Sequence, residues 1–155
     1  MTTITLTLEH LTRLDLGPVQ TAIAPLLADP LPTDPDPLRF TIEIPRDPTD
    51  PRELSELPEV RLWFIRLDAV YPWLPYYLDW TSELARYTAM LVPHQFSRTE
   101  GIQFNPEALE IFIMAKVFAV HRWLQAHHIS QTGKLRAMTQ TLGYDLDSRF
   151  FEQLG

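Results

Sequence analysis

The sequence predicts an α+β fold: a mostly helical single domain with a small antiparallel sheet and a central buried helix. Three observations support this prediction. Two short segments alternate apolar and polar residues, a long apolar stretch near 106–127 follows a clear helix start, and the C-terminal region is patterned as helices. With 155 residues, 45% of them hydrophobic and 21% charged, residues 1–155 suit one domain that buries a core.

The alternating segments are expected to be half-buried strands. Within Thr3–Leu8, isoleucine and leucine fall on one face and threonine on the other. The segment Phe40–Ile44 repeats the pattern, because successive side chains of a strand point to opposite faces. Two strands alone are marginally stable, so the sheet must pack on helices.

The region between these strands is predicted to hold a short helix, Val19–Ala28, which follows Pro18 at its first turn. Nine of the 14 prolines fall between Pro25 and Pro58. Each proline fixes its own φ and restricts the residue before it. We therefore expect residues 29–37 to form a stiff, proline-rich surface loop, and the segment from Pro45 to Pro51 to be rich in turns.

The middle of the chain is predicted to form two helices and a loop. Pro58–Val70 has proline and an acidic residue in its first turn, as helices often do. The apolar run Trp63–Ile65 leaves a central strand as the alternative there. A second helix is expected over Ser82–Leu91, and Val92–Asn105 reads as a loop.

The clearest helix start in the chain is Asn105, followed by Pro106 and Glu107. Asparagine is a favoured N-cap residue, and proline suits the first helical position. The helix is expected to run to about His127, with so narrow a polar stripe that it should be the buried centre of the fold. Helices over Lys134–Leu142 and Leu146–Leu154 complete the prediction.

The sequence lacks the residues that several kinds of catalytic and cofactor-binding site require. The chain has no cysteine, which excludes thiolate metal sites and cysteine nucleophiles. Its five glycines are isolated, so no phosphate-cradling loop is present. His127 and His128 are best placed to interact with carbonyls at a helix C-terminus, and a weak metal site that adds His121 is the alternative. We expect no catalytic residue, cofactor or metal.

Two segments carry residues suited to recognition. Five of the ten residues in Tyr71–Trp80 are aromatic, which suits either core packing or a protein interface. The loop that holds His94, Arg98 and Glu100 has the residue types of an acid–base site, and a small enzyme using this loop is an alternative function. A hydrogen-bonded structural loop is the simpler interpretation.

The net charge of −7 is unevenly distributed. Residues 1–60 hold four basic and eleven acidic residues, whereas the remaining residues hold nine of each. An acidic N-terminal part disfavours nucleic acid as a partner and can steer a basic protein surface. The sequence shows no signal peptide and no membrane-spanning run, so a cytoplasmic location is expected.

Distinctive phrases occur along the chain: PRDP, RLWFIRLD and YPWLP within Pro45–Trp80, and LVPHQFSRTEGIQ within Glu83–Phe118. In these the chain resembles the chlororespiratory reduction 6 family of cyanobacteria and chloroplasts. The resemblance implies a non-enzymatic assembly factor for the photosynthetic NDH-1 complex. Its implied partner is a subunit of the hydrophilic arm, notably the ferredoxin-like iron–sulfur subunit.

We expect the partner to bind a surface that joins two loops to part of the aromatic segment. An unrelated protein-binding adaptor using the His94–Glu100 loop is a further alternative. The predicted partner-binding residues are Arg46, Asp47, Arg52, Glu53, Tyr76, Tyr77, His94, Gln95, Phe96, Arg98 and Glu100.

Overall fold

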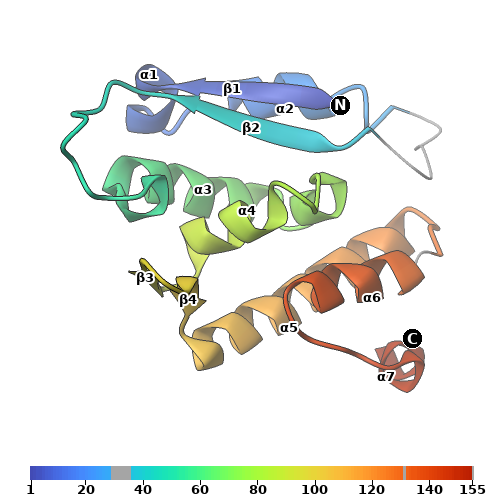
Figure 1. Cartoon of the computed structure of the whole chain (residues 1–155). Helices are drawn as coiled ribbons and strands as arrows, with labels where there is room; N and C mark the ends of the chain where they lie inside the picture. The colour runs from blue at the N-terminus through green and yellow to red at the C-terminus, as the bar shows by residue number, and fades with distance from the viewer. Residues whose placement is uncertain (29–35, 131, 155) are drawn as a thin grey trace. The chain divides into compact units, whose positions relative to one another are not determined.

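The computed structural model describes residues 1–28, 36–130 and 132–154 of the chain (Figure 1). Its contacts divide the chain into two compact units, Met1–Leu91 and Val92–Gly155. The prediction that residues 1–155 form a single domain remains a prediction. The predicted loop at 29–37 lies outside the described residues, apart from residues 36 and 37.

The described residues of the first unit form a two-stranded sheet and four α-helices. Its strands are β1 (Thr2–Thr7) and β2 (Leu38–Glu43), and its α-helices are α1 (Leu8–Thr12), α2 (Gly17–Ile23), α3 (Pro58–Val70) and α4 (Leu84–Leu91). Two short 3₁₀ turns, η1 (Leu54–Glu56) and η2 (Leu74–Tyr77), precede and follow α3. The second unit contains β3 (His94–Ser97), β4 (Gly101–Phe104), α5 (Pro106–Ala126), α6 (Thr132–Thr141) and α7 (Ser148–Leu154). The α+β prediction is confirmed.

The strands β1 and β2 pair as predicted, but they run parallel, with Ile4 opposite Phe40 and Leu6 opposite Ile42. The antiparallel direction expected for this sheet was therefore wrong. Alternation shows which face of a strand is buried, and it carries no information about direction. Parallel strands need a long crossover connection, and the segment that contains α1 and α2 provides one.

The core of the first unit forms where the sheet meets α3. Figure 1 shows β1 and β2 side by side along α3 and α4. The ring of Phe40 lies edge-on to Trp63 and Phe64, with centroids 6.0 and 5.2 Å apart. Trp63 is fully buried and donates a hydrogen bond from Nε1 to the Asp15 carbonyl oxygen at 2.8 Å. The alternative of a strand at Trp63–Ile65 is wrong, because these residues lie within α3.

A cluster of charged side chains fastens β2 to the segment before α4. Arg39 Nη2 lies 3.3 Å from Asp79 Oδ2, and Arg86 Nη1 lies 3.0 Å from Glu83 Oε1. Glu83 is buried, and that burial raises the pKa of its carboxyl group. Near this cluster Leu78 bridges to Leu38 in parallel. These contacts hold the chain after η2 against the edge of the sheet.

Four predicted helices begin or end differently in the structure, and two of them, α6 and α7, begin at Thr132 and Ser148 rather than at Lys134 and Leu146. Helix α2 ends at Ile23 rather than continuing to Ala28, and Pro25 follows its C-cap residue Ala24. A proline inside a helix lacks the N–H that the helix needs, which explains the early end. Helix α4 begins at Leu84 rather than at Ser82, because residues 79–83 form a turn with Asp79 accepting hydrogen bonds from Thr81 and Ser82.

Helix α5 begins where the sequence predicts, at Pro106, and Asn105 is its N-cap. The Asn105 side chain accepts hydrogen bonds from the backbone N–H groups of Glu107 and Ala108, at 3.1 and 3.3 Å. One face of α5 is buried, with Ile113, Val117 and Val120 fully enclosed. The expectation that the helix is buried nearly all round was wrong, because Ile111 is 65% exposed.

Removing the N-cap of α5 should measurably lower the stability of the second unit. We expect Asn105→Ala to lower the free energy of unfolding by about 1 kcal/mol, the usual effect of losing a side chain that satisfies the first N–H groups of a helix. Asn105→Asp keeps an acceptor in place and serves as the control. Urea denaturation followed by circular dichroism measures both variants, and equal losses for the two would contradict the capping role.

Candidate functional site

The predicted partner-binding residues of the first unit lie in the turn-rich segment before α3 and in η2. In the turn-rich segment, Asp50 is the organising residue. Its carboxylate accepts hydrogen bonds from the backbone N–H and the guanidinium of Arg52, at 2.9 to 3.2 Å. Arg46 reaches the same carboxylate at 3.8 Å and also donates to the Arg52 carbonyl. Arg46 and Arg52 therefore pair with Asp50 and stabilise the conformation of this segment.

Asp47 and Glu53 also make local hydrogen bonds in this segment. Asp47 Oδ1 accepts hydrogen bonds from the Thr49 backbone N–H and hydroxyl, at 2.9 and 2.7 Å. These hydrogen bonds, the backbone one first, lower the pKa of Asp47. The Glu53 N–H donates to Glu56 at 2.7 Å, at the start of η1. The four predicted residues of the segment thus form a braced turn whose outer side remains in solvent.

The stability that the braced turn contributes should decrease at acidic pH. Hydrogen bonds from the Arg52 side chain, and then from its backbone, lower the pKa of Asp50 to about 2 from 3.8. A depressed folded-state pKa contributes stability above the unfolded value, and that stability is lost as the pH falls through the folded value. We expect the melting temperature to fall between about pH 4 and pH 2, and Asp50→Asn to flatten that fall.

Thermal melts at several pH values test this expectation. Glu110→Gln is the control, since Glu110 is exposed and makes no hydrogen bond or ion pair within the described part of the chain. An acid profile of Asp50→Asn that matches the wild type would contradict the role given to Asp50.

Tyr76 and Tyr77 lie in η2 and are both 2% exposed. Their rings meet edge-on with centroids 5.5 Å apart, and Trp73 contacts Tyr77 at 5.8 Å. Burial raises the pKa of Tyr77 to about 12. Rings enclosed in this way favour the core interpretation of the aromatic segment, and they offer no area to a partner unless the fold opens. Both tyrosines therefore lie outside the candidate surface.

The predicted loop of the second unit is a β-hairpin. Strands β3 and β4 pair antiparallel, with Phe96 opposite Ile102 and His94 opposite Phe104. The Ser97 hydroxyl accepts hydrogen bonds from the N–H groups of Thr99 and Glu100, both at 3.3 Å, which closes the turn. Gly101 follows with φ at +75°, a left-handed conformation that favours glycine.

One face of the hairpin presents apolar side chains to solvent. Phe96 is 53% exposed and its cross-strand neighbour Ile102 is 36% exposed. At the turn, Arg98 is exposed and makes no hydrogen bond or ion pair with any residue that the structure describes. Glu100, by contrast, accepts a hydrogen bond from Gln103. A pair of apolar side chains beside an uncommitted guanidinium is the combination that recurs in protein-binding hot spots.

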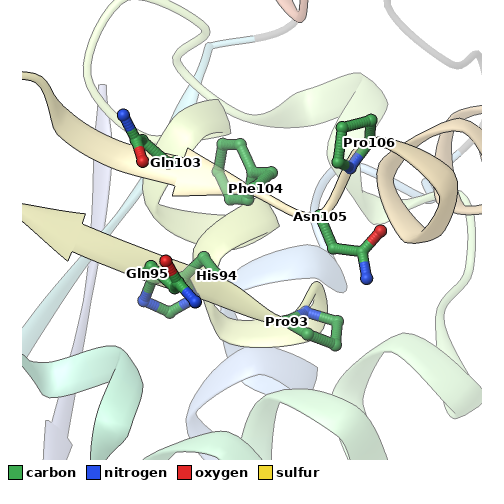
Figure 2. A pocket seen from close by; sticks show the side chains of 7 residues that line it. All are labelled: Pro93, His94, Gln95, Gln103, Phe104, Asn105 and Pro106. Atoms are coloured by element: carbon green, nitrogen blue, oxygen red, sulfur yellow. The ribbon is translucent and has the colours of Figure 1, made fainter.

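A hollow lies at the open end of the hairpin, where β3 begins and β4 ends. Figure 2 shows the seven side chains that line it: Pro93, His94, Gln95, Gln103, Phe104, Asn105 and Pro106. Its volume is about 420 Å³. The lining is neutral amide, imidazole and apolar surface, which suits a short peptide segment or a side chain of a partner better than a charged small molecule.

The hairpin separates the residues of the enzymatic alternative. His94 pairs with Phe104 at the open end, whereas Arg98 and Glu100 belong to the turn at the other end. The strand β3 rises about 10 Å over the three residue steps from His94 to Ser97, where the turn begins. This separation is too large for a hydrogen bond between His94 and Glu100, which lies in the turn. His94 Nδ1 lies instead 3.2 Å from the Val92 carbonyl oxygen. This acid–base constellation is not assembled.

His127, near the end of α5, acts as the simpler interpretation predicts. His127 is the C-cap of the helix, and its Nδ1 lies 2.8 Å from the Trp123 carbonyl oxygen. His128 follows with φ at 57°. Among the described residues, no cluster of three or more histidine, aspartate or glutamate side chains is arranged to hold a metal ion.

The sequence profile of the chlororespiratory reduction 6 family matches residues 6–153. The chain belongs to the chlororespiratory reduction 6 family. The match includes the braced turn, the hairpin and α5, so the exposed features described above are part of the family region. Membership links the protein to chlororespiratory reduction. No solved structure matches the chain.

Among the described residues of this family member, no helix is both long and apolar enough to cross a membrane.

Two residues of the hairpin surface, Ile102 and Gln103, were not predicted from the sequence. The alternation of apolar and polar residues from Ile102 to Phe104, preceded by glycine, is the signal that marks them.

Proposed function

We propose that this protein is a non-enzymatic assembly factor that binds a subunit of the hydrophilic arm of the photosynthetic NDH-1 complex during maturation. The observation that carries the proposal is membership of the chlororespiratory reduction 6 family over residues 6–153. The proposed client is the ferredoxin-like iron–sulfur subunit, and the proposed location is the cyanobacterial cytoplasm.

The β3–β4 hairpin is the proposed client-binding element. Phe96 and Ile102 already stand in solvent, so binding buries apolar area without a rearrangement of the hairpin. Arg98 can form a bidentate pair with a client carboxylate, because its guanidinium has no competing partner among the described residues. The hollow at the opposite end of the hairpin offers room for a side chain of the client.

The braced turn supports the same proposal as a second, weaker contact. Arg52 is 53% exposed despite its pairing with Asp50, so its outer edge can still meet an acidic group. A client that touched both elements would need to reach one surface on each unit. The hairpin alone is sufficient for the proposal, because its exposed groups include both apolar area and a charge.

Affinity capture tests the proposed function. The tagged chain is expressed in a cyanobacterium in place of its own copy, and the bound proteins are identified by mass spectrometry. We expect subunits of the NDH-1 hydrophilic arm to be enriched over a capture with the untagged strain. Enrichment of proteins unrelated to NDH-1, together with normal NDH-1 levels in a deletion strain, would refute the proposal.

A further inference from the structure

The long helix α5 carries an exposed stripe that the proposed function does not use. We define the α5 stripe as Glu107, Ile111, Ala115, Phe118 and Arg122, which recur every three or four residues and share one side of the helix. All five are exposed, with Ile111 at 65% and Phe118 at 43%. We propose that two copies of this chain pair antiparallel through the α5 stripe.

The middle of the stripe is apolar, which argues that something covers it. Exposed large apolar side chains placed in line on one helix are typical of an interaction surface, whereas single ones are common on any protein. Phe150 of α7 widens the apolar area, since its ring lies 6.4 Å from that of Phe118. Burying this area against a partner would contribute roughly 25 cal/mol per Å².

The ends of the stripe carry opposite charges, and this order selects the partner. Glu107 lies in the first turn of α5, and Arg122 lies in its last turns. In an antiparallel pair of identical helices, a two-fold axis between residues 114 and 115 places Glu107 opposite Arg122 of the second copy. The same register places Ile111 opposite Phe118. Both contacts then occur twice, as an isologous interface requires.

Other arrangements of two copies lose this match. A parallel pairing would set Glu107 beside Glu107 and Arg122 beside Arg122, which places like charges together at both ends. A shift of one turn along the helix would separate both charge pairs and both apolar pairs. The charge order on the stripe therefore favours a single register of the antiparallel pair.

The centre of the stripe suits a close helix crossing. Ala115 is small, and small residues at a contact let two helix axes approach to about 8 Å. Its neighbour Met114, partly exposed, has an adaptable side chain that can fill the space beside the axis. The apolar contact is thus continuous from Ile111 across the two-fold axis to Phe118.

Charge reversal tests the pairing directly on the purified full chain. We expect sedimentation equilibrium to show a monomer–dimer equilibrium. Glu107→Arg and Arg122→Glu should each raise the dimer dissociation constant by about tenfold or more, since each creates two like-charge contacts. The double variant E107R/R122E should restore it to within about threefold of the wild type. Glu110→Arg is the matched control, because residue 110 lies about 100° around the helix axis from Ile111.

Cross-linking supplies a second, independent readout, since the chain has no cysteine of its own. With a short bismaleimide, Ala115→Cys should give a covalent dimer and Glu110→Cys should not. Circular dichroism establishes that each variant is folded. A chain that stays monomeric up to several hundred micromolar overturns the proposal, as do equal effects at positions 107 and 110. These measurements contain no client, so they fail or succeed independently of the proposed function.

Discussion

Replacing Phe96 or Arg98 with alanine should sharply weaken capture of the proposed NDH-1 client while leaving the fold intact. Hot-spot side chains of these types commonly contribute about 2 kcal/mol to binding, which corresponds to a loss of about 30-fold in affinity. Both side chains stand in solvent in the free protein, so their removal should change the free energy of unfolding by no more than about 0.5 kcal/mol. Quantitative capture and a thermal melt of the same preparations measure the two effects.

Matched controls exist on α3 of the first unit. Leu62 is 56% exposed and Arg66 is exposed, so Leu62→Ala and Arg66→Ala remove similar side chains from a different element. We expect both to capture the client normally. If the double variant Phe96→Ala/Arg98→Ala folds and still captures the client at full strength, the hairpin is not the binding element.

The largest loss of stability is expected from Trp63→Ala. Trp63 contacts Phe40 and Phe64 edge-on, the latter at 4.9 Å between centroids, and its Nε1 satisfies the Asp15 carbonyl. Removing a buried tryptophan leaves a cavity and an unpaired acceptor, which typically costs about 3–5 kcal/mol. Urea denaturation of the full chain, followed by circular dichroism, measures the loss.

The neighbouring residue provides the comparison for this prediction. Leu62→Ala alters the exposed side of the same helix and should cost no more than about 0.5 kcal/mol. Trp63→Phe keeps most of the packing and should fall between the two. A Trp63→Ala variant that is as stable as Leu62→Ala would show that the sheet does not depend on this contact.

Short sequence patterns predicted much of the fold, because they reflect interactions between residues that lie close together in the sequence. The period-two alternation at Thr3–Leu8 identifies the buried face of β1, since Ile4 and Leu6 are enclosed. Its last residue was wrong, because Leu8 begins α1 and is 43% exposed. The N-cap at Asn105 is likewise a short-range effect that three residues determine. The direction of pairing depends on the connection between the strands, and the pattern of each strand alone does not contain it.

Other features escaped prediction for a different reason. Strands β3 and β4 have four residues each, so the alternation from Ile102 to Phe104 is too short to predict a strand by itself. On α5, apolar composition shows which residues avoid water, and it does not show whether this chain or a second one covers them. The residue types of the 94–100 segment suggested a binding loop, and only the structure separates exposed Phe96 from buried Tyr76 and Tyr77.

The parallel pairing of β1 with β2 also has a consequence for synthesis on the ribosome. Thr2–Thr7 is made before its partner strand Leu38–Glu43, which follows only after residues 8–37 have been made. At roughly 5–20 residues per second, that interval is about 2–6 s, and the covering helix α3 takes longer still. During this time the alternating strand has no partner within its own chain. Until Leu38–Glu43 is made, the backbone N–H and C=O groups that β1 pairs with β2 stay exposed on an unpaired strand edge.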